Sequence, residues 1–242
     1  MKVTVLDSSD AVAAALAERV ASMLRAKPDA VLGLASGRTP VAGYAEMRRL
    51  HAAGRMDWSR ASTFNLDEFA GIDGNHAGSF RTFMQKHLFG GMNLRPERIH
   101  FLKGNAANLD AECERYEADI AEAGGIDLQI LGIGSNGHIG FNEPGDDLHV
   151  RTHRVALMDS TRRDNALLFG NDPGRVPAEA LSMGMGTILQ ARHIVLVATG
   201  TKKADCIRQT ANGRMTTRVP ASLLQLHADV ELVLDREAAS RI

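Results

Sequence analysis

One segment of the sequence, 131–145, holds three polar side chains that could transfer protons: Asn136, His138 and Glu143. An imidazole with a carboxylate within reach, which sets its tautomer, is the usual construction of a general acid/base. A single histidine hydrogen-bonded in a turn would fit the same residue types. The acid/base interpretation therefore depends on what other segments bring to the same place.

Within this loop, Gly132, Gly134 and Gly137 spell GxGxxG after an apolar run, a spacing that is typical of dinucleotide-binding sites. That motif must open a helix, because the helix N-terminus binds the pyrophosphate. The further glycines and Pro144 prevent a helix here and predict a rigid, irregular loop. We therefore expect no dinucleotide cofactor at this loop.

A second loop places Asp67 and Glu68 just after another apolar run. A carboxylate at the end of a buried strand can be partly desolvated, which raises its basicity and suits it to remove a proton from carbon. Two solvated loop charges are the simpler explanation for an isolated Asp-Glu pair. The apolar side chains that flank this pair favour the wall of a structured site.

Two further segments have residue types that bind phosphate. The first carries Ser36, Gly37 and Thr39 before a predicted helix, so hydroxyls, backbone N–H groups and a helix N-terminus could all donate to an anion. The second is 199–203, where Lys203 follows a strand and could reach the same anion. A capped strand-to-helix turn and a surface lysine are the common alternatives for each segment taken alone.

These segments must be positioned by the elements around them, which alternate short apolar runs with amphipathic stretches. We predict strands over 3–6, 30–34, 61–65, 98–101, 128–132, 193–198 and 230–234. Apolar spacing and Ala-rich composition predict helices over 11–24, 41–53, 79–88 and 108–123, with Pro40 at the first helical position. This rhythm predicts an α/β fold with a doubly wound parallel sheet, in which ligands bind beyond the carboxyl ends of the strands. Without repeats or linkers we expect one domain over 1–242.

Composition excludes several classes of partner. Lys plus Arg total 28 and Asp plus Glu 29, a net charge of −1, which gives no electrostatic reason to expect nucleic acid or an anionic membrane. The first apolar run is too short for a signal peptide, and no segment approaches a span of about 20 apolar residues, so we expect a cytoplasmic protein. Cys113 and Cys206 have no neighbours at zinc-ligand spacing, so we expect reduced thiols and no metal site.

Taken together, these segments resemble the glucosamine-6-phosphate deaminase family, in its short bacterial type, over almost the whole chain. The matching stretches are 32–40, 65–69, 132–145, 220–222 and 235–239. The run Gly-x-Asn-Gly-His-Ile-Gly-Phe-Asn-Glu-Pro-Gly is highly specific, and it occurs with the Asp67 loop at the spacing of the family.

The resemblance implies a three-layer αβα domain around a mainly parallel, Rossmann-like sheet, as in ribose-5-phosphate isomerases and CoA transferases. It also implies an enzyme without metal or organic cofactor that converts D-glucosamine 6-phosphate into D-fructose 6-phosphate and ammonia in amino-sugar catabolism. By the same resemblance Asp67 moves a proton between C2 and C1, and His138 opens the pyranose ring. Asn136 and Glu143 orient His138.

The resemblance implies that Ser36, Gly37, Thr39 and Lys203 hold the 6-phosphate, and that 151–182 forms a lid over the site. Two positions depart from the family pattern. Many longer members have aspartate where this chain has Asn136, although shorter bacterial members have asparagine.

The second departure is Leu167, which stands where the pattern has a phosphate-contacting arginine. Arg38 occupies a phosphate-loop position that is usually Gly or Ser. We hypothesise that Arg38 supplies the contact that Leu167 cannot make.

Other functions stay open at this point. A galactosamine-6-phosphate deaminase would use the same machinery on the C4 epimer. A 6-phosphogluconolactonase has a similar phosphate loop, but it needs neither Glu143 nor a carbon base, and a sensor without activity would lack Asp67 or His138. The chain stops soon after its last predicted strand, without the C-terminal extension of the longer, allosteric relatives, so we expect a monomer or small homo-oligomer.

Overall fold

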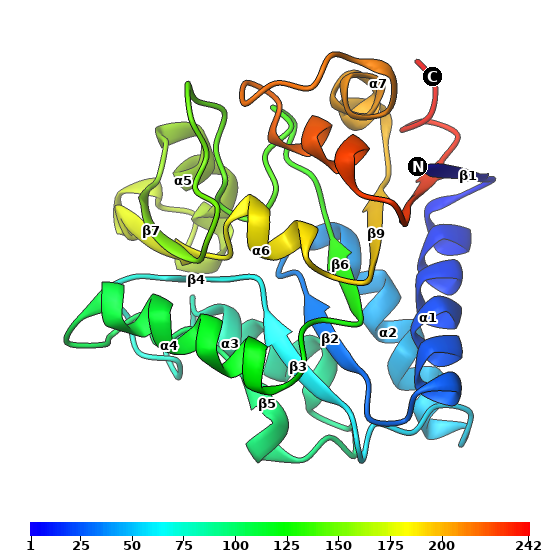
Figure 1. Ribbon diagram of the computed structural model, residues 1–242, viewed down its shortest axis with the longest axis horizontal. Coiled ribbons are helices and arrows are strands. Elements are labelled where there is room, and N and C mark those ends of the chain that lie inside the picture. Colours follow the sequence, from blue (N-terminus) through cyan, green and yellow to red (C-terminus); the bar gives the residue numbers. More distant parts are fainter.

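The computed structural model describes residues 1–242, and a seven-stranded parallel sheet lies at its centre (Figure 1). The strands are β1 (Lys2–Leu6), β2 (Val31–Leu34), β3 (Ser62–Asn65), β5 (Ile99–His100), β6 (Leu128–Leu131), β9 (His193–Ala198) and β10 (Val230–Asp235). They lie in the order β1-β10-β9-β6-β2-β3-β5, and every neighbouring pair is parallel. All seven predicted strands are present, which confirms the α/β fold class.

Helices cover both faces of this sheet, and each face has its own hydrophobic core. The helices are α1 (Ser9–Ala26), α2 (Arg38–Ala52), α3 (Phe80–Met84), α4 (Leu109–Glu122), α5 (Asp159–Asn165), α6 (Met185–Leu189) and α7 (Ala204–Asn212). Val195 and Val197 of β9 belong to the core that α1 and α2 cover, whereas Ile194 and Leu196 belong to the core that α4, α6 and α7 cover. Because both faces are buried, the central strands are mainly apolar. The result is the three-layer αβα arrangement that the sequence predicts.

The four predicted helices are present, with differences at their ends. Pro40 is the third residue of α2 and not the first, as predicted, but it is still within the first turn, where a helix needs no N–H. The predicted helix 79–88 is divided between α3 and a π-helical turn, η1 (Gln85–Phe89). Short 3-10 turns complete the chain: η2 (Pro96–Arg98), η3 (Ala166–Phe169), η4 (Pro173–Arg175), η5 (Thr201–Lys203) and η6 (Pro220–Leu226).

A second, antiparallel sheet, which the sequence analysis did not predict, lies beside the main one (Figure 1). Its strands are β4 (Asp67–Phe69), β8 (Glu179–Ser182) and β7 (His153–Ala156), in that order. A third core, which includes Phe69, Phe80, Phe141 and Phe169, joins this sheet to η3. The three strands are short and come from distant parts of the chain, so local alternation of polar and apolar residues does not reveal them.

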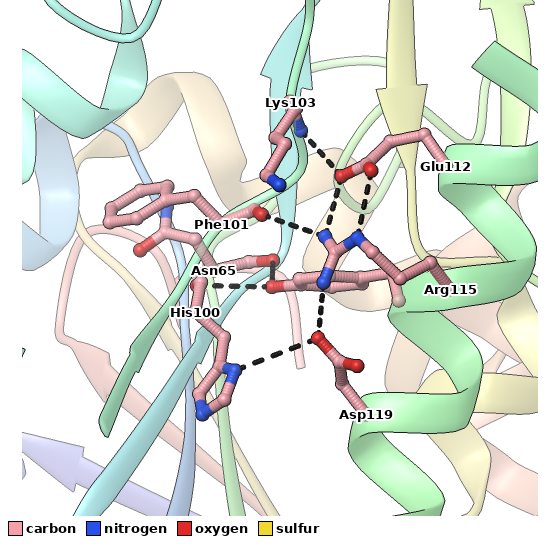
Figure 2. A network of polar contacts seen from close by, with 8 residues as sticks. Asn65, His100, Phe101, Lys103, Glu112, Arg115 and Asp119 are labelled. Atoms are coloured by element: carbon pink, nitrogen blue, oxygen red, sulfur yellow. Dashed lines mark hydrogen bonds and ion pairs between the residues drawn. The ribbon is translucent and has the colours of Figure 1, made fainter. Parts of the chain in front are cut away.

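Polar contacts hold α4 against the carboxyl ends of β3 and β5 (Figure 2). Arg115 of α4 pairs with two carboxylates of its own helix and donates to the Phe101 carbonyl at 3.2 Å. The Tyr116 hydroxyl donates to the Asn65 carbonyl at 2.7 Å. Asn65 is the last residue of β3, so this contact fixes the strand end shortly before Asp67.

Candidate active site

The four loops that the sequence analysis singled out follow four neighbouring strands. Asp67 comes after β3, and Ser36 comes after β2. His138 lies in the loop after β6, and Lys203 comes after β9. The sheet order β9-β6-β2-β3 and the parallel pairing put the carboxyl ends of these strands at one edge, where such sheets bind ligands.

His138 and Glu143 face one another within the loop after β6. The His138 Nδ1 and Glu143 Oε2 atoms are 3.6 Å apart. Asn136 links the two residues, because its Nδ2 donates to Glu143 Oε2 at 3.3 Å and its Oδ1 accepts from the His138 backbone N–H at 3.1 Å. An amide and a carboxylate therefore orient the imidazole.

Burial lowers the pKa of His138, an effect that Glu143 opposes and Lys203 reinforces. A lowered pKa keeps the imidazole neutral at pH 7, so that one ring nitrogen can accept a proton. The Nδ1 atom is buried and has no hydrogen-bond partner. Because Nδ1 faces Glu143, Nε2 is the nitrogen that can take up a proton, and Glu143 is placed to stabilise the imidazolium that forms.

Glycines give this loop its shape. A Cβ atom at Gly134 would lie 2.3 Å from His138 Cε1, so only glycine leaves the space that the ring occupies. Gly137 and Gly140 have φ angles of 85° and 58°, in the left-handed region that favours glycine. The segment forms no helix, so its GxGxxG spacing does not stand at a helix N-terminus.

Asp67 is the first residue of β4 and is buried, with 4% of its surface exposed. Its Oδ1 atom has no hydrogen-bond partner. Burial, and to a smaller extent the neighbouring Glu68, raise the pKa of Asp67 well above its usual range. A free carboxylate of raised basicity suits a base that removes a proton from carbon.

The structure separates the two adjacent carboxylates, of which the family resemblance had singled out Asp67. Glu68 points to the start of α3, where it accepts from two backbone N–H groups at 2.9 and 3.1 Å and from the Ser79 hydroxyl at 2.9 Å, and it also accepts from the N–H of Phe69 in its own strand at 2.9 Å. Successive side chains of a strand point to opposite faces, which explains why Asp67 points elsewhere. Glu68 anchors α3, and only Asp67 is free to react.

The loop after β2 ends at a helix N-terminus without a side-chain cap. Gly37 is the N-cap residue of α2, and no side chain accepts from the first N–H groups of the helix. These groups, which include those of Arg38 and Thr39, carry partial positive charge and can donate to an anion. The Ser36 hydroxyl accepts from the Asn65 amide at 2.6 Å and keeps its own proton to donate.

Two basic side chains lie near the same end of α2. The Lys203 ammonium donates to the Ile133 carbonyl at 2.7 Å, and burial lowers its pKa, with Arg38 adding to the shift. Arg38 is exposed, and its guanidinium donates to the Asp164 carbonyl of α5 at 3.4 Å. Arg38 thus reaches the segment that carries Leu167, which is 63% exposed on η3.

Sequence reasoning missed two polar side chains that contact the site residues. Thr161 of α5 is 2% exposed, and its hydroxyl donates to Glu143 Oε1. Asn65 donates to Ser36 from the end of β3. The sequence shows that Thr161 is a polar residue of the lid segment. It does not show that Thr161 contacts Glu143, because Glu143 lies outside that segment and only the fold brings the two together.

No three side chains of His, Cys, Asp or Glu lie together in an arrangement that could hold a metal ion. Cys113 and Cys206 are buried, free thiols, as expected. None of the helices has the length and apolar character that crossing a membrane requires.

The fold and this edge define an α/β protein that can move protons beside a bound anion. The chain belongs to the family of glucosamine-6-phosphate isomerases and 6-phosphogluconolactonases, which matches residues 6–233. It is 47% identical to glucosamine-6-phosphate deaminase 2 of Bacillus subtilis (strain 168), over 100% of this chain and 98% of that relative. It is 48% identical to the glucosamine-6-phosphate deaminase of Halothermothrix orenii over 91% of each chain.

Solved structures give the same grouping. A monomeric glucosamine-6-phosphate deaminase matches with a TM-score of 0.96 and 41% identity over 100% of both chains. A 6-phosphogluconolactonase from Trypanosoma brucei has a TM-score of 0.77 and 18% identity, over 100% of this chain and 98% of that one. The lactonase shares the fold, whereas the deaminase also shares much of the sequence.

Proposed function

We propose that the chain is a glucosamine-6-phosphate deaminase, which converts D-glucosamine 6-phosphate and water into D-fructose 6-phosphate and ammonia in amino-sugar catabolism. Relatives with this name are 43–48% identical over 91–100% of the chain. One observation carries the proposal at the site: two separate proton-transfer groups share one sheet edge. They are an imidazole paired with a carboxylate and a buried, unpartnered carboxylate.

The substrate is oriented by its phosphate. The N–H groups at the start of α2 donate to the phosphate oxygens, together with the hydroxyls of Ser36 and Thr39. Lys203 and Arg38 add charge-assisted hydrogen bonds. With the phosphate at the β2 loop, the sugar extends between the loops after β6 and β3, which carry His138 and Asp67.

His138 opens the pyranose ring. The neutral imidazole takes the proton of the C1 hydroxyl, the bond between C1 and the ring oxygen breaks, and a proton is returned to that oxygen. Glu143, with Asn136, stabilises the imidazolium between these two transfers. The product is the open-chain 2-amino aldehyde, which is activated for loss of the C2 proton.

Asp67 then takes the C2 proton and delivers it to C1. Loss of the C2 proton gives an enolate, and the ammonium group on C2 passes one proton to O1, which gives the enol with a neutral amine on C2. Protonation at C1 converts this enol into a protonated imine at C2. Water adds to the imine and ammonia leaves, which gives the ketose 6-phosphate. Desolvation makes Asp67 basic enough for this step.

The same groups would act on galactosamine 6-phosphate, because neither proton transfer involves C4. Hydrolysis of a phosphogluconolactone is the less favoured alternative, because it needs no carbon base and leaves Asp67 without a role. We further propose that the protein acts as a monomer, like the structural relative described as monomeric. In this proposal residues 1–242 form one domain. Its segment 151–182 acts as a lid that closes over the substrate.

An assay on three substrates tests the function. Purified protein is given glucosamine 6-phosphate, galactosamine 6-phosphate or 6-phosphogluconolactone, and ammonia, ketose 6-phosphate and acid release are measured. We expect ammonia and fructose 6-phosphate in equal amounts from glucosamine 6-phosphate. Lactone hydrolysis without ammonia from either amino sugar would overturn the proposal.

A further inference from the structure

We propose that Thr161 of α5 is a positioning residue for the acid/base pair, and that docking of α5 completes the geometry of Glu143 and His138. The inference rests on the proposed deaminase function. It assigns a role in the reaction to a residue outside the four loops that the sequence points to.

The two oxygens of Glu143 have different partners. Oε2 accepts from Asn136 at 3.3 Å and lies 3.6 Å from His138 Nδ1. The hydroxyl of Thr161 supplies the only hydrogen bond that Oε1 receives. Because a carboxylate is planar, fixing Oε1 also fixes the direction in which Oε2 faces the imidazole.

Packing alone does not account for a threonine at this position. The side chain is 2% exposed, and valine, which has nearly the same shape, would fill the same volume. A buried hydroxyl costs free energy unless it is hydrogen-bonded, and within a helix it usually turns back to a carbonyl of its own helix. The Thr161 hydroxyl instead has Glu143, 18 residues earlier in the chain, as its partner.

The position of α5 is set by contacts other than this hydrogen bond. Arg162 donates to the Val176 carbonyl at 3.1 Å. Ala166 and Phe169 of the following turn pack in the third core with Phe141, which belongs to the same loop as Glu143. The helix and the loop are thus held together by packing. The hydrogen bond from Thr161 then fixes the Glu143 carboxylate relative to the helix.

The contact has a chemical consequence. A hydroxyl that donates to a carboxylate favours its ionised form. Without this donor, the Glu143 carboxylate can turn away from His138, and the imidazolium then loses the charge that stabilises it. Loss of the hydroxyl therefore predicts a fall of about one pH unit in the acidic limb of kcat/KM, which the pair determines as a unit.

The test compares pH profiles of kcat and kcat/KM for four variants with the wild-type enzyme on glucosamine 6-phosphate. Thr161→Val and Thr161→Ala remove the hydroxyl, and both should move the acidic limb downward and lower kcat about ten-fold with little change in KM. Thr161→Ser keeps the hydroxyl and should retain the wild-type profile. Ser160→Ala alters the exposed neighbour on α5 and should change nothing.

A double substitution shows whether Thr161 acts through Glu143. In a Glu143→Gln background, which has no ionised carboxylate to stabilise, Thr161→Val should produce no further pH shift. A wild-type profile for Thr161→Val, or a shift of equal size in the Glu143→Gln background, would overturn the inference. A wild-type protein that releases no ammonia from either amino sugar would instead refute the proposed function itself.

Discussion

Among single residues, Asp67 and Glu68 differ in how many hydrogen bonds the fold gives them. Asp67 Oδ1 and His138 Nδ1 are buried and make no hydrogen bond, whereas Glu68 accepts from four donors. Native proteins satisfy most buried polar atoms, and at a sheet edge that binds ligands an unpaired carboxylate oxygen is open to a proton of the substrate. Asp67 and His138 are also the residues to which the proposed reaction assigns the proton transfers.

The residue pattern alone could not separate Asp67 from Glu68, and only the family resemblance pointed to Asp67. Their roles depend on which side chain faces the site, and this follows from the pairing of β4 with β8, in which Asp67 lies opposite Ser182. That pairing joins segments more than a hundred residues apart in the chain. Local pattern carries no information about it.

Arg38 gives a prediction at the same scale. If its guanidinium binds the phosphate, Arg38→Gly removes charge-assisted hydrogen bonds that contribute about 1.5 to 3 kcal/mol each. The KM for glucosamine 6-phosphate should rise roughly ten-fold to a hundred-fold, while kcat changes less. Steady-state kinetics measure both constants.

The double variant Arg38→Gly with Leu167→Arg tests whether the two positions bind the same phosphate, because Arg38 already reaches the segment that carries Leu167. Restored KM is expected if the two positions serve one anion. Arg38→Lys keeps the positive charge but lacks the two parallel N–H groups of the guanidinium. Its KM should lie between those of the wild type and Arg38→Gly. An unchanged KM in Arg38→Gly alone would show that Arg38 points to solvent in the complex.

At the scale of elements, the loop after β6 holds the imidazole by leaving room for it. The sequence predicts an irregular loop from its glycines and proline, and the structure confirms this. The sequence does not reveal that Gly134 lies against the His138 ring, because that contact depends on the conformation of the turn between the two residues. The long strands and helices are likewise predicted well from periodicity, whereas the small antiparallel sheet of β4, β8 and β7 is missed.

Gly134→Ala tests this function of the loop. The new Cβ would lie 2.3 Å from His138 Cε1, so the ring must move. A displacement of about 1 Å at a catalytic group costs on the order of a hundred-fold in rate, and we expect kcat to fall by that amount. Gly132→Ala is the matched control, since its Cβ would meet nothing within 4 Å. Equal activity of the two variants would contradict the account.

At the scale of the whole molecule, the edge of the main sheet is held by an ion-pair network. Glu231 of β10 accepts from Arg19 of α1 at 2.7 and 2.6 Å and from the Thr4 hydroxyl of β1 at 2.7 Å. Lys2 lies 3.2 Å from the same carboxylate. These contacts join the first strand and helix to the last strand of the chain.

The hydrogen bonds from Arg19, together with those from Thr4 and Lys2, lower the pKa of Glu231 from 4.5 to about 2. Because the folded pKa is lower than the unfolded one, the stabilisation is complete above about pH 4.5 and is lost as the pH falls towards 2. Glu231→Gln should lower the free energy of unfolding by about 2 kcal/mol at pH 7, allowing for solvent screening. Urea unfolding at several pH values measures this difference.

The difference between wild type and Glu231→Gln should shrink steadily between pH 5 and pH 3. Glu18→Gln is a suitable control, because the Glu18 carboxylate pairs with Arg25 on the exposed surface of α1 and should matter little. A difference for Glu231→Gln that does not depend on pH would show that packing, and not charge, connects these elements.

The central claim is that Asp67 carries the C2 proton, and glucosamine 6-phosphate deuterated at C2 tests it most directly. The deuterium is followed by NMR and mass spectrometry during turnover by the wild-type enzyme and by Asp67→Asn. We predict that the wild-type enzyme transfers deuterium from C2 to C1 of fructose 6-phosphate or to solvent. We also predict that Asp67→Asn binds the substrate but slows this loss by at least a hundred-fold. Deuterium released by Asp67→Asn at the wild-type rate would contradict the account.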